Sequence, residues 1–171
     1  MEQKIVNHPL HTTWVLWYHS IDEVHWTKDT YIKVAEMGTV EEFLGVFNNF
    51  ESFGKGMFFL MRKDIFPQWE DESNINGGYW SYKIGKNIAE KAWFELAAAC
   101  VGERLTKRVE DMYNINGISY SPKINNVIIK ILNRYAEKND AGQLAEHIDN
   151  LHPGTSQFKS HIENKEEFVY Q

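Results

Sequence analysis

The sequence predicts an α+β fold in which helices cover one face of a curved antiparallel β-sheet. Short segments rich in aromatic and β-branched residues, the composition typical of strands, come in adjacent pairs along the chain. Between these pairs lie segments in which apolar residues recur with helical spacing. Paired neighbouring strands favour an antiparallel sheet with its helices on one face. The opposite, concave face is then free to hold a ligand.

Six segments have the composition of strands, and each is short enough to be one strand. The first precedes the helical segments and the last lies near the C-terminus. They span residues 13–18, 57–62, 79–84, 117–120, 127–132 and 156–161.

Two helices are well signalled and a third is weaker. The first spans 39–47, where Thr39 and Glu42 have capping-box spacing. The second spans 87–101, with Asn87 as its N-cap and Gly102 as its stop. The third runs from about 140 to 151 and ends before Pro153.

Length and composition favour a single intracellular domain over residues 1–171. No linker, repeat, secretion signal or apolar run of roughly 20 residues is present in the sequence. The single cysteine, Cys100, lies in an apolar run and is expected to be a buried hydrophobe in a reducing compartment. The net charge of −6 argues against a protein that coats nucleic acid through a basic face. The negative net charge is still compatible with a protein that binds one nucleotide by stacking and a few local cations.

Two of the six tryptophans lie in polar loops. Trp69 stands in the run PQWEDE at 67–72, and Trp26 has polar neighbours on both sides. A ring in such a loop is better placed to stack on a ligand than to be buried. Glu70 adds a carboxylate beside the Trp69 ring, which suits a flat ligand with donors on its edge, such as guanine. The other tryptophans are expected mainly in the core: Trp14, Trp17, Trp80 and Trp93.

The sequence contains no motif for catalysis or metal binding that matches a known template. His19 and His25, with acidic residues between them, match no zinc-ligand spacing. The acidic run at 70–72 leaves a nucleotide-processing enzyme as an alternative, but adjacent side chains in a loop seldom converge on one bond. Asp71 and Glu72 are therefore expected to be solvated. We expect a binding protein without catalytic residues, metal or cofactor, and we interpret Gly77-Gly78 as a flexible step after the loop.

Several motifs together resemble the eukaryotic translation initiation factor 4E family, which binds the 7-methylguanosine cap at the 5′ end of messenger RNA. The most specific is PQWEDE at 67–72 with GGYW at 77–80. HPL at 8–10 with WVLW at 14–17 is similar to the family's N-terminal signature, and TVEEF at 39–43 to the start of its first long helix. WFEL at 93–96 resembles its second long helix, and FKSH at 158–161 with EFV at 167–169 resembles a shortened C-terminal end. The resemblance covers nearly the whole chain.

The resemblance implies three helices on the convex face of the sheet and a cap-binding slot on its concave face. It implies that Trp26 and Trp69 sandwich the methylated guanine, and that Glu70 accepts the N1–H and N2–H hydrogens. The backbone N–H of Trp69 would donate to the guanine O6. Lys123 stands where the family places an arginine that contacts the cap phosphates.

The phosphate side departs from the family pattern. Ile128 stands at the position of the next basic residue, and Tyr79 replaces a basic residue of the Gly-Gly motif. Leu132 stands where a tryptophan lines the methyl group, and Lys159 or Lys165 is a candidate to compensate for the missing cations. These departures bear on triphosphate affinity and methyl discrimination more than on the base sandwich.

The resemblance also implies a partner surface on the helical face, where the scaffold initiation factor 4G or a 4E-binding repressor docks a helix. The family's central tryptophan on this surface is Leu44 here, which lacks the indole N–H donor. Packing of Val40 and Leu44 in the core is the alternative, and we expect partial exposure. The surface consists of His8, Pro9, Val40, Leu44, Phe94 and Glu95.

Two functions follow from the resemblance. The first is a cap-binding protein that acts in translation initiation in the cytoplasm, with the nucleus as a second compartment. The alternative is a divergent paralogue that sequesters or represses capped messages without recruiting the scaffold. A nucleotide-processing enzyme is the third hypothesis, from a different class.

Overall fold

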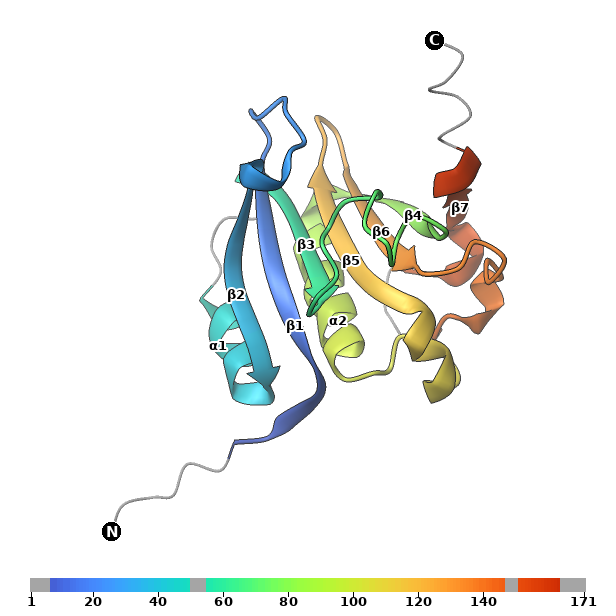
Figure 1. The fold of residues 1–171 in the computed structure, drawn as a ribbon, viewed down its shortest axis with the longest axis horizontal. Helices are drawn as coiled ribbons and strands as arrows, with labels where there is room; N and C mark the ends of the chain where they lie inside the picture. Colours follow the sequence, from blue (N-terminus) through green and yellow to red (C-terminus); the bar gives the residue numbers. More distant parts are fainter. Residues whose placement is uncertain (1–6, 50–54, 147–150, 164–171) are drawn as a thin grey trace.

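A seven-stranded antiparallel sheet organises the part of the chain that the computed structural model describes, residues 7–49, 55–146 and 151–163 (Figure 1). The strand order is β2-β1-β3-β5-β6-β4-β7. Two helices, α1 (Val40–Asn48) and α2 (Lys86–Val101), lie behind the sheet on one face. The strands are β1 (Pro9–Ser20), β2 (Tyr31–Thr39), β3 (Gly56–Arg62), β4 (Gly78–Ile84), β5 (Ile115–Pro122), β6 (Val127–Asn133) and β7 (Gln157–Ser160). The predicted α+β class with a curved antiparallel sheet is confirmed.

The main core lies between the sheet and the two helices. Alternate residues of each strand point into it, as the two-residue repeat of a strand requires. Trp14, Trp80 and Trp93 are each almost fully buried there, as predicted. Trp17 is half-buried on the opposite face, where its ring meets that of Phe66 edge-on at 5.0 Å. The predicted burial of Cys100 is confirmed, and burial raises the pKa of its thiol.

The strand β2 was not predicted from the sequence. Its residues Ile32, Lys33, Val34 and Glu36 are exposed, so the segment lacks the apolar alternation of a half-buried strand. The physical reason is its place at the edge of the sheet, beside β1 only. Charged residues on such a strand hinder pairing with another chain.

The helices begin and end largely where the sequence predicts. The capping box of α1 is present, with the Thr39 hydroxyl accepting from Glu42 N at 3.2 Å. Asn87 is not the N-cap of α2, because extended Gly85 takes that place and the helix begins at Lys86. The predicted helix at 140–151 is also wrong over its described part, which forms a 3-10 turn, η4 (Ala141–Gln143). Residues 147–150 lie outside the described residues. In the part of the chain that the structure describes, none of the helices combines the length and the apolar character of a membrane span.

Gly77 and Gly78 are required by close packing, so their interpretation as a flexible step is wrong. A Cβ at Gly77 would lie 1.8 Å from the carbonyl oxygen of Asn133. A Cβ at Gly78 would lie 2.3 Å from the carbonyl oxygen of Lys159. Both glycines therefore let the backbone of β4 approach its two neighbouring strands.

A buried ion pair joins β3 to the end of α2. The Arg62 guanidinium donates to both carboxylate oxygens of Glu103, at 2.7 Å each. It also donates to the carbonyl oxygens of Ile115 and Met112, at 2.8 Å and 2.9 Å. The bidentate geometry and the extra bonds satisfy charges that are otherwise costly to bury.

Candidate functional site

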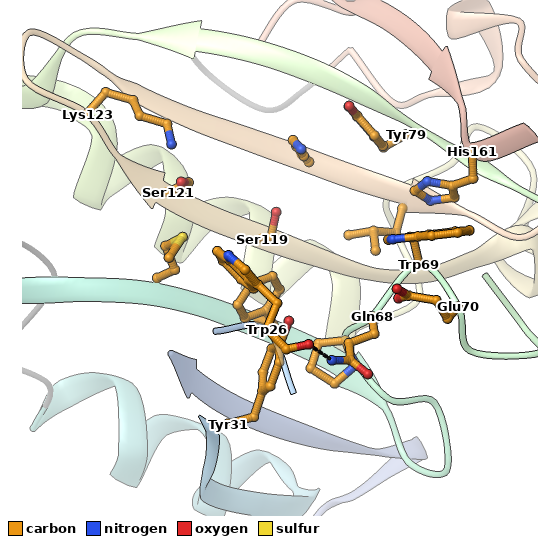
Figure 2. Close-up of a pocket in the computed structure, with 15 residues that line it drawn as sticks. Trp26, Tyr31, Gln68, Trp69, Glu70, Tyr79, Ser119, Ser121, Lys123 and His161 are labelled. Atoms are coloured by element: carbon orange, nitrogen blue, oxygen red, sulfur yellow. Dashed lines mark hydrogen bonds between the residues drawn. The ribbon is translucent and has the colours of Figure 1, made fainter. Parts of the chain in front are cut away.

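A pocket of about 530 Å³ opens on the face of the sheet opposite the helices (Figure 2). A volume of this size suits a small organic ligand. Its floor comes from β3, β4, β5 and β6, and its walls come from the loops that follow β1 and β3. The pocket is lined by Trp26, Tyr31, Met57, Phe59, Pro67, Gln68, Trp69, Glu70, Tyr79, Ser119, Ser121, Lys123, Lys130, Leu132 and His161.

Trp26 is held at the pocket by the buried ring of His19. The two rings stack with centroids 4.0 Å apart and an angle of 3° between their planes. His19 Nε2 lies 3.0 Å from the carbonyl oxygen of His25 and 3.1 Å from the hydroxyl of Thr30, so it also fastens the loop. The Trp26 ring remains 50% exposed. His19 therefore supports one face of the ring, a role that no sequence pattern indicates.

The loop that carries Trp69 and Glu70 is organised by buried polar groups. Asn74 is fully buried, and its amide donates to the carbonyl oxygens of Phe66 and Gln68 at 3.0 Å and 2.7 Å. Its Oδ1 accepts from the side chain of Asn116 on β5 at 2.9 Å. The loop is thus bonded to the sheet rather than left to move independently. Sequence reasoning missed both asparagines.

Asp71 also shapes this loop, so its expected solvation is wrong. Its carboxylate accepts from the backbone N–H of Phe66 at 3.0 Å and of Ser73 at 2.9 Å. Glu72 is exposed, as predicted. Of the three consecutive acids only Glu70 lines the pocket, so they do not converge on a bound group.

The two tryptophan loops meet beside the pocket. The side-chain amide of Gln68 donates to the carbonyl oxygen of Trp26 at 2.7 Å, the dashed line in Figure 2. Trp26 and Trp69 therefore border one cavity although 42 residues separate the bonded positions 26 and 68 in the chain. Trp69 is 39% exposed, and the Glu70 carboxylate lies beside it. Burial, and then the charge of Glu70, raise the pKa of Tyr31.

Two lysines line the pocket. Figure 2 shows Lys123 and Glu70 on opposite sides of the cavity. Lys123 is exposed, just after β5. Lys130 on β6 also lines the pocket, with its Nζ 3.9 Å from the centroid of the Tyr79 ring. Sequence reasoning missed Lys130, although Leu132, which the resemblance does place near the site, lies two residues further on the same strand face.

The structure shows where most of the residues that depart from the family pattern lie. Tyr79 and Leu132 face each other across β4 and β6, and both line the pocket. Ile128 is half-buried on β6 outside the lining set. Lys159 is exposed on β7 beside Tyr79, and Lys165 lies outside the described residues.

His19 and His25, the two histidines considered as metal ligands, make other contacts in the structure. His19 contacts the loop that carries Trp26, through the carbonyl oxygen of His25. The ring of His25 pairs with the Glu23 carboxylate at 2.8 Å on the surface. Across the described ranges, no group of three His, Cys, Asp or Glu side chains is placed to hold a metal ion.

The residues of the expected partner surface come from the start of β1 and the residue before it, from α1 and from α2. Val40 is 37% exposed and Leu44 is 41% exposed, which confirms their partial exposure. His8 bonds to the Glu41 carboxylate at 2.6 Å, and its carbonyl accepts from the backbone N–H of Val40 at 2.8 Å. These bonds fix the start of β1 against the start of α1. Pro9 is exposed, and Phe94 and Glu95 are half-buried.

The open antiparallel sheet, with helices on one face and an aromatic pocket on the other, defines a single-sheet ligand-binding protein. The pocket has the Glu70 carboxylate on one side and the Lys123 amine on the opposite side. The chain belongs to the eukaryotic initiation factor 4E family. The sequence model of the family described as "Eukaryotic initiation factor 4E" matches residues 9–168.

Relatives from other organisms are similar to this chain in sequence. The chain is 32% identical to translation initiation factor 4E of Dictyostelium discoideum over 148 residues, which is 81% of this chain and 57% of the relative. It is 36% identical to the Saccharomyces cerevisiae factor over 124 residues, 68% of this chain and 57% of the relative. The matched part thus spans little more than half the length of these relatives.

Solved structures are similar over most of their length. A complex of Caenorhabditis elegans eIF4E-3 with the 4E-binding protein Mextli and a cap analog has a TM-score of 0.82 at 25% identity, covering 94% of this chain and 96% of that chain. Ascaris suum eIF4E-3 with the m7G cap has a TM-score of 0.78 at 25% identity, covering 91% and 92%.

Proposed function

We propose that this chain is a single-domain protein that binds the 7-methylguanosine cap of messenger RNA and acts in translation initiation in the cytoplasm. The observation that carries the proposal is the shared pocket of Trp26, Trp69 and Glu70, with Lys123 on the far side. Family membership and the similarity to eIF4E-3 structures that hold the cap support it.

The chemistry of the pocket fits this ligand. Trp26 and Trp69 stack on the flat base, which contributes roughly 1–3 kcal/mol per base. Methylation at N7 makes the base cationic, so an electron-rich ring adds cation–π attraction of up to about 2 kcal/mol. Glu70 accepts the two donors on the base edge, a charge-assisted pair of bonds. Lys123 faces the phosphates, and no bond is made or broken.

The test is quenching of tryptophan fluorescence by 7-methyl-GTP, with unmethylated GTP as the reference. We expect saturable quenching, and the Glu70→Ala variant should bind at least about tenfold more weakly because a charged acceptor is lost. Glu72→Ala is the matched control, because it removes an exposed acid two residues away. Absence of quenching at high micromolar ligand, or equal affinities for both variants, would refute the assignment.

We also propose that the helical face docks a helix from a 4G-like scaffold or a 4E-binding repressor. The partial exposure of Val40 and Leu44 supports this, and the similar C. elegans structure contains a 4E-binding protein. Leu44→Asp should abolish capture by a 4G-type peptide without changing cap affinity. Ile124→Asp is the control, since Ile124 is 90% exposed in the turn between β5 and β6. Cap binding without capture of this peptide would favour the sequestering paralogue instead.

A further inference from the structure

Lys130 is a cation inside the pocket without a carboxylate partner among the described residues. It stands on β6, which is paired on both sides, and it is partly buried. Its Nζ lies over the Tyr79 ring at 3.9 Å. A lysine held in this way loses less freedom on binding a ligand than the exposed Lys123 at the rim.

The groups around Lys130 leave its charge unbalanced. The positions paired with it are Ser81 on β4 and Ser119 on β5, which carry no charge. Burial lowers the pKa of Lys130 to about 8, and the positive charges of Lys123 and Lys159 add to this effect.

The remaining titratable groups facing the pocket do not supply a countercharge. Tyr79 from β4 offers its ring face. Burial, and then the charge of Lys130, lower the pKa of His161 after β7 to about 4, so that ring is neutral at pH 7. Glu70 belongs to the loop after β3 and stands beside Trp69. No carboxylate of the described residues pairs with Lys130, so its charge is available to an anionic ligand.

We propose that Lys130 is an affinity-determining residue for the phosphate groups of the ligand, and that the pocket takes up a proton at this amine when a phosphorylated nucleotide binds. This inference rests on the proposed function and specifies how the same site recognises the phosphate groups of its ligand. A phosphate stabilises the charged amine, which the empty pocket disfavours. Below pH 8 the amine already carries its proton and affinity is highest. Above pH 8 binding must first recover that proton, so affinity falls as pH rises.

The experiment compares 7-methyl-GTP with the nucleoside 7-methylguanosine in fluorescence titrations of the wild type, Lys130→Met and Lys130→Arg. At pH 7 the preference for the triphosphate over the nucleoside should fall about tenfold or more in Lys130→Met. Lys130→Arg keeps the charge and should retain most of the preference. Lys91→Met is the matched control, because it removes the same charge from an exposed site on α2, on the opposite side of the sheet from the pocket. Thermal unfolding of each variant establishes that it is folded.

The pH dependence separates charge from structure. Between pH 7 and pH 9 the Kd of the wild type for 7-methyl-GTP should rise by about tenfold relative to Lys130→Arg, whose charge persists. Titration of the ligand's own groups is common to both proteins and cancels in this ratio. Calorimetry at pH 8 in two buffers of different ionisation enthalpy should show about half a proton more uptake by the wild type than by Lys130→Arg.

The failures of the inference and of the proposed function are distinguishable. If neither nucleoside nor nucleotide binds the wild type, the cap-binding function itself fails and the inference fails with it. If both ligands bind but Lys130→Met keeps its preference, or if the ratio does not change with pH, only the inference is overturned. Tighter binding by Lys130→Met would also overturn it, because the amine would then oppose the cationic base.

Discussion

Replacing Asn74 by alanine should loosen the loop that presents Trp69 and Glu70. The substitution removes three hydrogen bonds of a fully buried side chain, two to carbonyl oxygens of the loop and one from Asn116. Of the groups left behind, Asn116 is fully buried, so water replaces the lost bonds only in part. At about 1 kcal/mol for each lost bond, the free energy of unfolding should fall by about 3 kcal/mol. Asn116 keeps its bond to the carbonyl oxygen of Ser73, which limits the loss.

Urea denaturation measures this loss directly. A domain of this size typically unfolds with about 5–15 kcal/mol, so the variant should stay folded, with a lower midpoint and an unchanged m-value. Affinity for 7-methyl-GTP should weaken severalfold as well, because binding must then order the loop. Asn76→Ala is the matched control, since Asn76 is exposed in the same loop and its change should stay within about 0.5 kcal/mol. A loss below about 1 kcal/mol for Asn74→Ala, or one equal to the control, would refute the reasoning.

Two further predictions concern ionisable side chains that are buried in the folded protein. Arg62→Met should lower the unfolding free energy by about 3–5 kcal/mol in urea denaturation, because Glu103 then keeps an unpaired buried charge. Replacing both Arg62 and Glu103 by methionine should cost less than the sum of the two single changes. Additive losses would argue against a coupled pair. His161 is neutral in the folded protein, with a pKa of about 4, whereas the unfolded chain gains a proton at this residue near pH 6.5. Stability should therefore fall as pH drops from 6.5 to 4, and between pH 7 and 4.5 the wild type should lose about 2 kcal/mol more than His161→Phe. Parallel pH curves for these two proteins would show that His161 does not contribute.

Much of the fold follows from local signals in the chain. The capping box at Thr39 and Glu42 acts between residues three apart, so the spacing of these two residue types is enough to predict it. The buried tryptophans lie in segments whose pattern already indicates strand or helix. The edge strand β2 and the turn at 141–143 were not predicted, because an exposed strand carries no alternation and a short 3-10 turn resembles a helix in composition.

The candidate site also combines residues that the sequence predicts with residues that only the structure reveals. Trp69 and Glu70 are neighbours in the chain, so their pairing follows directly from the sequence, and the placement of Trp26 in a polar loop indicates the second ring. The supports of these rings are not visible in the sequence. His19 and Asn74 act by hydrogen bonds and stacking within compact loops, and their residue types alone do not reveal which carbonyl groups they meet.

Residue types and short-range spacing thus predicted the α+β class and the aromatic and acidic end of the pocket, and the family resemblance implied the partly exposed helical surface. The basic end was decided only by tertiary structure. Lys130 looks like a solvated lysine between isoleucines in the sequence, and it becomes a pocket cation because β4 and β5 flank β6 and place Tyr79 against it. Burial and the charges of Lys123 and Lys159 then change its pKa. Such an environment is set by strands that are distant in sequence, and no local pattern encodes it.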